Sequence, residues 1–273
     1  MSHWLRIFAA EYLKQHRRIF GGPLVVFSML IWPVLQLATT YYTMLPVLDT
    51  PGIAERWPVA AEPQRLLAFL AAGAFAFMFY FSLVQSAWHL SFERISGTLE
   101  LIFLSPASRV ALMLGNGSGA LVQNTWLAGC FAVAAAIAGG ALHVAHPGMY
   151  LVAAVALLVP AIVWGAFLNS LLIFSRDSAF LYTLLDDPLW FVTGVRLPLF
   201  AMPVAIQAIG VAVPLTSSLA VLRGALLDAQ PLSTLAAPLA VLAALCALLA
   251  AATVALLRWG EARAQRTGSM QLY

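Results

Sequence analysis

The sequence contains few charged side chains. Of its 273 residues, 14 are basic and 11 are acidic, so charged residues make up 9% of the chain, against about 25% in ordinary soluble domains. Hydrophobic residues make up 62%, and the mean hydropathy is +0.91. So little polar surface could not cover a soluble domain of this size. The composition therefore excludes a soluble enzyme, a disordered chain and a nucleic-acid-binding domain, and it indicates an integral membrane protein.

Lysine is almost absent, because Lys14 is the only one. A phosphate-binding loop of the GxxxxGK[ST] type needs a lysine between glycine and serine or threonine. Lys14 instead lies between Leu13 and Gln15. The sequence therefore excludes this nucleotide site in the chain, and any use of nucleotide energy would require a second protein. We expect no catalytic site and no cofactor in this chain.

Cysteine and histidine are also scarce and scattered. Cys130 and Cys246 each lie inside an apolar run, so we expect them to be small buried side chains rather than disulfide or metal ligands. His143 and His146 are three residues apart but have no third ligand nearby in the sequence. We therefore predict no metal site.

Five long apolar runs each have about the 20 residues that a membrane-spanning helix needs. They cover Pro23–Leu48, Leu66–Leu90, Val110–Leu142, Met149–Phe174 and Leu232–Leu257. A further apolar region, Ser178–Leu227, contains four prolines and is also interrupted by Gly194 and Gly210. Its length fits one span, two spans, or one span followed by a re-entrant hairpin.

The positions of the charges indicate how many times the region 178–227 crosses the membrane. Both terminal segments are short and basic, which is typical of cytoplasmic segments, and the loop before the second run is net negative. Two cytoplasmic termini require an even number of crossings, so Ser178–Leu227 supplies one. We therefore predict an all-α integral membrane protein with six transmembrane helices. An amphipathic helix (1–22) would lie at the inner interface, and a re-entrant extracellular helical segment (198–227) would lie between helices 5 and 6.

The loop between the second and third runs (91–105) carries several charges at the predicted inner face. Gly97 can end the preceding helix, and Ser105-Pro106 can start the next one. The short element between them would present Glu93, Arg94 and Glu100 to the cytoplasm. It could be a handle for a cytoplasmic partner, or a tight loop whose charges are merely solvated.

Two groups of motifs resemble one family. The string Glu93-Arg94-x-x-Gly97-Thr98-Leu99-Glu100, followed by Ser105-Pro106 and Arg109, resembles the signature of type-2 ABC exporter permeases. These are the membrane subunits of ATP-driven exporters for drugs, lipid-linked glycans and related amphiphiles. Thr193–Pro198, Val213–Thr216 and Arg223 resemble the family's fifth span, re-entrant segment and Pro-Leu-Thr…Arg element.

The resemblance implies that residues 1–273 form one type-2 ABC transmembrane domain in a bacterial or archaeal cytoplasmic membrane. It implies a dimer with a second permease copy or a paralogue, and a substrate path at their interface. Cytoplasmic ABC ATPase subunits would hold the ATP and Mg. They would contact this chain through Glu93, Arg94, Gly97, Thr98, Leu99 and Glu100. The re-entrant element would include Arg196, Pro214, Thr216 and Arg223.

Asp186 and Asp187 lie in the fifth predicted span, where many family members have only apolar or neutral residues. A carboxylate in the membrane costs roughly 2.5–3.5 kcal/mol, so it should face protein or water. These two side chains could pair with an arginine such as Arg176, or line a polar substrate vestibule. Alternatively, the helix begins later than we suppose, and they lie at the inner interface just before Pro188.

Other polar and aromatic side chains lie within the predicted spans. Asn116, Gln123 and Asn124 share one helical face, which favours hydrogen bonds between helices over a substrate lining. Trp164 and Phe167, in the middle of a span, are candidates for apolar substrate contact. Most other tryptophans and tyrosines, including Trp57, lie near predicted span ends, which is typical of an aromatic belt.

Two alternative functions remain open. Asp186 or Asp187 could carry protons in a secondary transporter, or the chain could be a membrane scaffold. Secondary transporters commonly contain inverted repeats, and none is evident in this sequence. The charged loop at the inner face favours the exporter.

Overall fold

The computed structural model describes residues 3–19, 21–48, 52–95, 115, 120, 123–130, 145–172 and 189–267. Within these residues the chain is helical and contains no strand. The helices are α1 (His3–Ile19), α2 (Pro23–Leu48), α3 (Ile53–Arg56), η1 (Pro58–Ala61), α4 (Pro63–Ile95), α7 (Gly148–Leu172), α9 (Leu189–Val192), η2 (Leu199–Ala201), α10 (Val204–Ala212), α11 (Pro214–Leu226) and α12 (Leu232–Thr267).

Several helices are long and apolar enough to cross a membrane. Three described segments meet this condition, within α4 (Pro63–Ser82), α7 (Gly148–Leu171) and α12 (Leu232–Gly260). They agree with three of the apolar runs, and α2 has the same bounds as a fourth. These helices confirm the all-α class and are compatible with a membrane protein. Most of the third and fifth expected spans lies outside the described residues.

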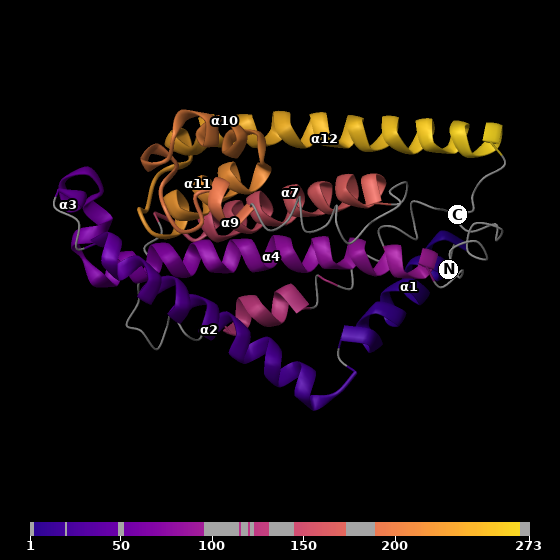
Figure 1. Ribbon diagram of the computed structural model, residues 1–273, viewed down its shortest axis with the longest axis horizontal. Helices are drawn as coiled ribbons and strands as arrows, with labels where there is room; N and C mark the ends of the chain where they lie inside the picture. Colours follow the sequence, from indigo (N-terminus) through magenta and orange to yellow (C-terminus); the bar gives the residue numbers. More distant parts are fainter. Residues whose placement is uncertain are drawn as a thin grey trace.

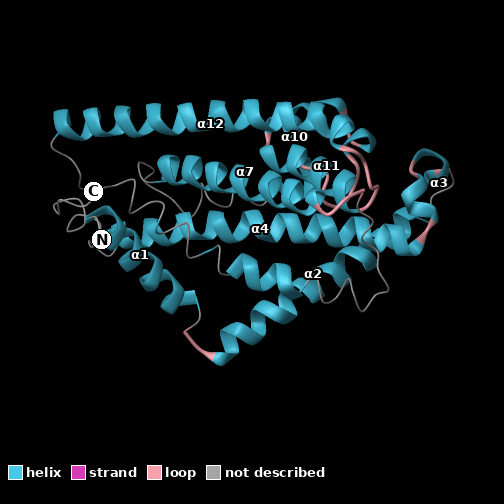
Figure 2. Cartoon of the chain, turned by 180° about the vertical axis from the view of Figure 1, so that it is seen from behind, coloured by secondary structure: helices cyan, strands magenta, loops and turns pink. Residues whose placement is uncertain are grey.

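The long helices α4, α7 and α12 run side by side along the molecule (Figures 1 and 2). α7 packs against α4, α11 and α12, and α2 packs against α4. The start of α1, the end of α12 and the last turn of α4 lie at one end, which we call the proximal end. The helices α3, α10 and α11 and the start of α12 lie at the other end, which we call the distal end (Figure 1).

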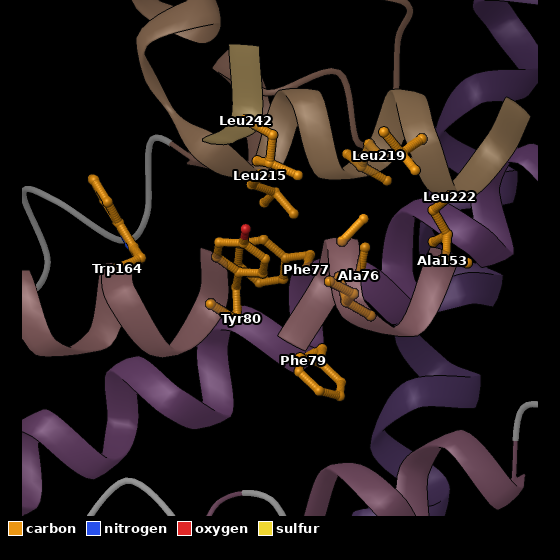
Figure 3. Packing of buried hydrophobic residues seen from close by; sticks show 14 of the residues in the cluster. Ala76, Phe77, Phe79, Tyr80, Ala153, Trp164, Leu215, Leu219, Leu222 and Leu242 are labelled. Carbon is orange, nitrogen blue, oxygen red and sulfur yellow. The ribbon is translucent and has the colours of Figure 1, made fainter. Parts of the chain in front are cut away.

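The main core forms where α4, α7, α11 and α12 meet (Figure 3). Phe77 and Tyr80 of α4 pack with Leu215 and Leu219 of α11 and with Leu242 of α12. The outward faces of these helices remain apolar. On α12 only 6% of the Leu232–Gly260 window is buried. Apolar side chains on both the buried and the exposed faces are expected when the surrounding solvent is lipid.

The amphipathic N-terminal segment forms α1, as predicted. The Trp4 and Phe8 rings stack with their centroids 5.7 Å apart, and Lys14 forms an ion pair with Glu11 at 2.8 Å. Glu11 is buried. A Cβ added at Gly115, in the third expected span, would lie 2.8 Å from the Cβ of Glu11. The backbone at Gly115 therefore lies close to α1.

Two expectations about single residues were wrong. Trp57 is 4% exposed and belongs to a second core cluster with Leu66 and Leu70, rather than to an exposed aromatic belt. η1 packs against α4, and its Val59 and Ala60 pack, together with residues of α2, around the cluster that contains this indole. Cys130 and Cys246 are only half-buried, whereas we expected them to be buried.

Candidate functional site

The distal end of the molecule brings the second group of motifs together. After α9 the chain reverses through residues 193–197. The Thr193 hydroxyl donates to the Leu189 carbonyl at 2.6 Å, and Gly194 has a φ of +80°. Glycine suits this left-handed conformation because it has no Cβ to clash. The turn carries Arg196 back over α9, where its guanidinium lies 4.7 Å from the centroid of the Trp190 ring.

Arg223 of α11 fastens this turn to the helical bundle. One guanidinium nitrogen, Nη1, donates to the Gly194 carbonyl at 2.8 Å. The other, Nη2, donates to the Val195 carbonyl at 2.9 Å and to the Phe69 carbonyl at 3.1 Å. The guanidinium carbon also lies 3.4 Å from the centroid of the Phe69 ring, a close cation–π contact. One side chain therefore joins α11, the 193–197 turn and α4.

The sequence analysis did not identify the two α4 residues that complete this arrangement. Phe69 lies between Arg223 and the Trp57 indole, which meets it edge-on at 5.2 Å. A Cβ at Gly73 would overlap the Val195 carbonyl oxygen and lie 2.7 Å from Nη2 of Arg223. A glycine inside an apolar helical run could have indicated such a close approach. We call Phe69, Gly73, Gly194, Val195 and Arg223 the arginine clamp.

The Pro-Leu-Thr motif forms the corner between α10 and α11, whose axes differ by 87°. Pro214 occupies the first position of α11, where its fixed φ suits a helix start. The Thr216 hydroxyl donates to the carbonyl of Gly210, near the end of α10, at 2.6 Å. A Cβ at Gly210 would overlap the Val192 carbonyl oxygen, so this glycine lets α10 pack directly against α9.

Polar side chains also connect α4 to its neighbours inside the core. The Tyr80 and Ser218 hydroxyls are 2.8 Å apart, which links α4 to α11. Ser82 donates a hydrogen bond to Asn124, whose side-chain amide donates to the Phe79 carbonyl at 3.2 Å. Asn124 therefore makes the interhelical hydrogen bonds expected of it. Gln123 is half-buried beside it, and Asn116 lies outside the described residues.

Trp164 and Phe167, the candidates for apolar substrate contact, lie on α7. Trp164 is buried in the main core, and the two ring centroids are 5.8 Å apart. The indole Nε1 of Trp164 and Oδ1 of Asn169 are both buried, and neither has a hydrogen-bond partner. Buried polar atoms are normally paired. The middle of α7 therefore presents two unsatisfied polar atoms.

The remaining candidate residues are only partly covered by the structure. Glu93 and Arg94 belong to the last turn of α4, at the proximal end. Gly97, Thr98, Leu99, Glu100, Asp186 and Asp187 lie outside the described residues. The proton-carrying alternative gains no support, because it depends on the two aspartates. Among the residues that the structure covers, no three His, Cys, Asp or Glu side chains gather as metal ligands.

The distal arrangement is suited to holding helices in register rather than to covalent chemistry. Its hydrogen bonds run from a guanidinium and hydroxyls to backbone carbonyls. No known protein family model matches the chain, and no curated protein matches it.

Proposed function

We propose that this chain is the membrane-spanning permease subunit of an ATP-driven ABC exporter, and that a separate ATPase subunit supplies the energy. Its cargo would be an amphiphilic drug, lipid or glycan-type molecule. The chain would have six transmembrane helices, with both termini in the cytoplasm. The segment 198–227 would enter the outer leaflet and return.

The observation that carries the proposal is the placement of the two motif groups at opposite ends of the bundle. Glu93 and Arg94 lie in the last turn of α4, at the same end as the start of α1 and the end of α12. Thr193, Thr216 and Arg223 lie in the elements at the distal end. An exporter needs this division, because its ATPase works in the cytoplasm while its outer end must release cargo.

α4 is well placed to transmit motion between the two ends. It is a continuous helix of 33 residues, so at 1.5 Å per residue it is about 50 Å long. Its distal part is held by Arg223 and its middle by the Tyr80–Ser218 contact. A displacement of Glu93 and Arg94 by a partner would therefore tilt a helix that is attached to α11 and to the 193–197 turn.

Part of the apolar surface of the described helices is exposed and is available for contact with lipid or with partner chains. The outward faces of α2 and α12 expose large apolar side chains, among them Leu24, Phe27, Leu248 and Val254. Lipid and a second permease copy or paralogue would cover these faces. The cytoplasmic ATPase would bind the 91–105 loop at the proximal end.

The test places a photo-crosslinking amino acid at Glu100 in the native membrane. We expect it to capture an ATP-binding protein, which a radiolabelled azido-ATP probe would reveal. The matched control carries the same amino acid at Glu55, an exposed acidic residue of α3 at the distal end, and should capture no such protein. The proposal fails if position 100 captures no ATP-binding protein, or if position 55 captures the same one.

A further inference from the structure

Arg196 and Arg223, both at the distal end, differ in how their terminal nitrogens are used. Arg223 directs both of its terminal nitrogens to backbone carbonyls of the chain. The Nε atoms of both arginines are buried without a hydrogen-bond partner. Arg196, however, lies over aromatic rings, and its terminal nitrogens make no hydrogen bond with the described residues. Among the described residues no carboxylate forms an ion pair with Arg196. We propose that Arg196 binds the phosphate headgroup of an anionic amphiphile at the distal end of the bundle.

The Arg196 guanidinium is held in place by a stack of rings. Phe77 of α4 lies in the main core, and its ring centroid is 3.9 Å from that of Trp190. Arg196 covers the indole at 4.7 Å and lies 5.8 Å from the Phe191 ring. A guanidinium that lies over an aromatic face loses water from that side, but its N–H donors point outward in the plane of the guanidinium and remain available. The site is therefore oriented before any ligand arrives.

The donor geometry favours phosphate. A guanidinium presents its five N–H groups as a planar fork that can bond two phosphate oxygens at once. Arginine remains charged at physiological pH even where it is partly buried. A positive charge that is partly removed from water is stabilised when an anion approaches. Arg196 therefore combines a fixed orientation, free donors and a need for negative charge.

The surroundings favour an amphiphile over a water-soluble anion. Phe191 is 65% exposed and Phe200 is 62% exposed, on either side of Arg196 in the sequence. Val204, at the start of α10, is 80% exposed. Of these side chains, the Phe191 ring lies beside the Arg196 guanidinium. Exposed apolar side chains are suited to acyl chains, and a basic side chain next to one of them is suited to a headgroup.

The inference stands apart from the proposed function, because headgroup binding requires no ATPase. If the exporter proposal holds, the bound amphiphile is either a membrane lipid or the cargo itself. If that proposal fails, the site remains a lipid site on a membrane protein. The two claims therefore fail in different experiments.

The test measures lipid binding to the purified full chain in neutral detergent by native mass spectrometry. Phosphatidylglycerol supplies the anionic headgroup, and phosphatidylcholine is the neutral comparison. We expect Arg196→Gln to weaken phosphatidylglycerol binding about 10-fold, the effect of losing one charge-assisted hydrogen bond. The affinity of Arg196→Lys for phosphatidylglycerol should lie between those of the parent chain and of Arg196→Gln, because lysine keeps the charge but lacks the planar pair of donors.

The matched control is Arg56→Gln, which removes the same charge from an exposed arginine at the distal end. It should change binding less than twofold. Inorganic phosphate at the same concentration as the lipid should not displace phosphatidylglycerol from the chain. If phosphate displaced phosphatidylglycerol, the ligand would not need to be an amphiphile, which would contradict the proposal. Equal losses in Arg196→Gln and Arg56→Gln would overturn the proposal, as would a parent chain that binds the two lipids equally.

Discussion

Replacing Arg223 by methionine tests the arginine clamp, because methionine keeps the apolar stem and removes the guanidinium. The variant loses the donors to the carbonyls of Gly194, Val195 and Phe69. The Phe69 carbonyl belongs to helix α4, whose own ladder bonds it. The two turn carbonyls receive no other hydrogen bond from the described residues. The two unpaired turn carbonyls therefore account for most of the expected loss of stability.

The expected loss follows from those two acceptors. A buried carbonyl left without a donor costs about 1–3 kcal/mol, so two cost roughly 2–6 kcal/mol. Losing the cation–π contact with Phe69 adds about 1 kcal/mol. Removing a buried guanidinium also relieves its desolvation, which offsets part of the sum. We expect Arg223→Met to lower the free energy of unfolding by about 3 kcal/mol.

The assay is unfolding by sodium dodecyl sulfate in mixed micelles, followed by circular dichroism and by tryptophan fluorescence. Trp57 should report on the distal end, because it packs against Phe69. Arg56→Met is the control, since Arg56 is exposed at the same end, and it should change stability by less than about 0.5 kcal/mol. The reasoning is refuted if Arg223→Met is as stable as this control.

Two further predictions concern α4. Gly73→Ala should destabilise the protein by about 1–3 kcal/mol in the same assay, because its Cβ would overlap the Val195 carbonyl oxygen. Gly129→Ala, where a Cβ would meet nothing within 4 Å, should be neutral or slightly stabilising, and a loss as large as that of Gly73→Ala would count against the close approach. Tyr80→Phe should cost about 1 kcal/mol, because it removes the hydrogen bond with Ser218. A double-mutant cycle with Ser218→Ala would measure the coupling, and a coupling energy near zero would contradict that bond.

The long helices could be predicted from the sequence because each is a sustained apolar run. α2 matches its predicted bounds, and α7 begins one residue before its predicted start and is helical through Leu172, the last described residue of this segment. α12 continues to Thr267, ten residues past the predicted end. Its polar residues after Leu257 have good helix propensity but no apolar signal. Hydropathy finds the membrane portion of a helix and misses its polar extension.

The contacts of the distal end could be predicted only in part. The prolines and glycines of 178–227 indicated a broken segment, and the structure has a sharp bend between α10 and α11 there. The partners of Arg223 could not be predicted, because all three are backbone carbonyls. Every residue carries a carbonyl, so sequence alone contains no signal for which one an arginine will reach.

Trp57 shows the same limit for an aromatic residue. Its place between two apolar runs suggested an interfacial belt, since tryptophan is common there. The chain instead packs η1 against α4 and buries the indole beside Phe69. The difference arises from tertiary contacts of a loop, which hydropathy cannot register.

The central claim is that a cytoplasmic ATPase drives this chain through the 91–105 loop. The most direct measurement is ATP hydrolysis by the reconstituted complex of the chain and the captured ATPase. The account predicts that the chain stimulates hydrolysis and that Glu93→Lys with Glu100→Lys abolishes the stimulation. The control Glu55→Lys, at the distal end, should leave it intact. Undiminished stimulation in the double variant would contradict the account.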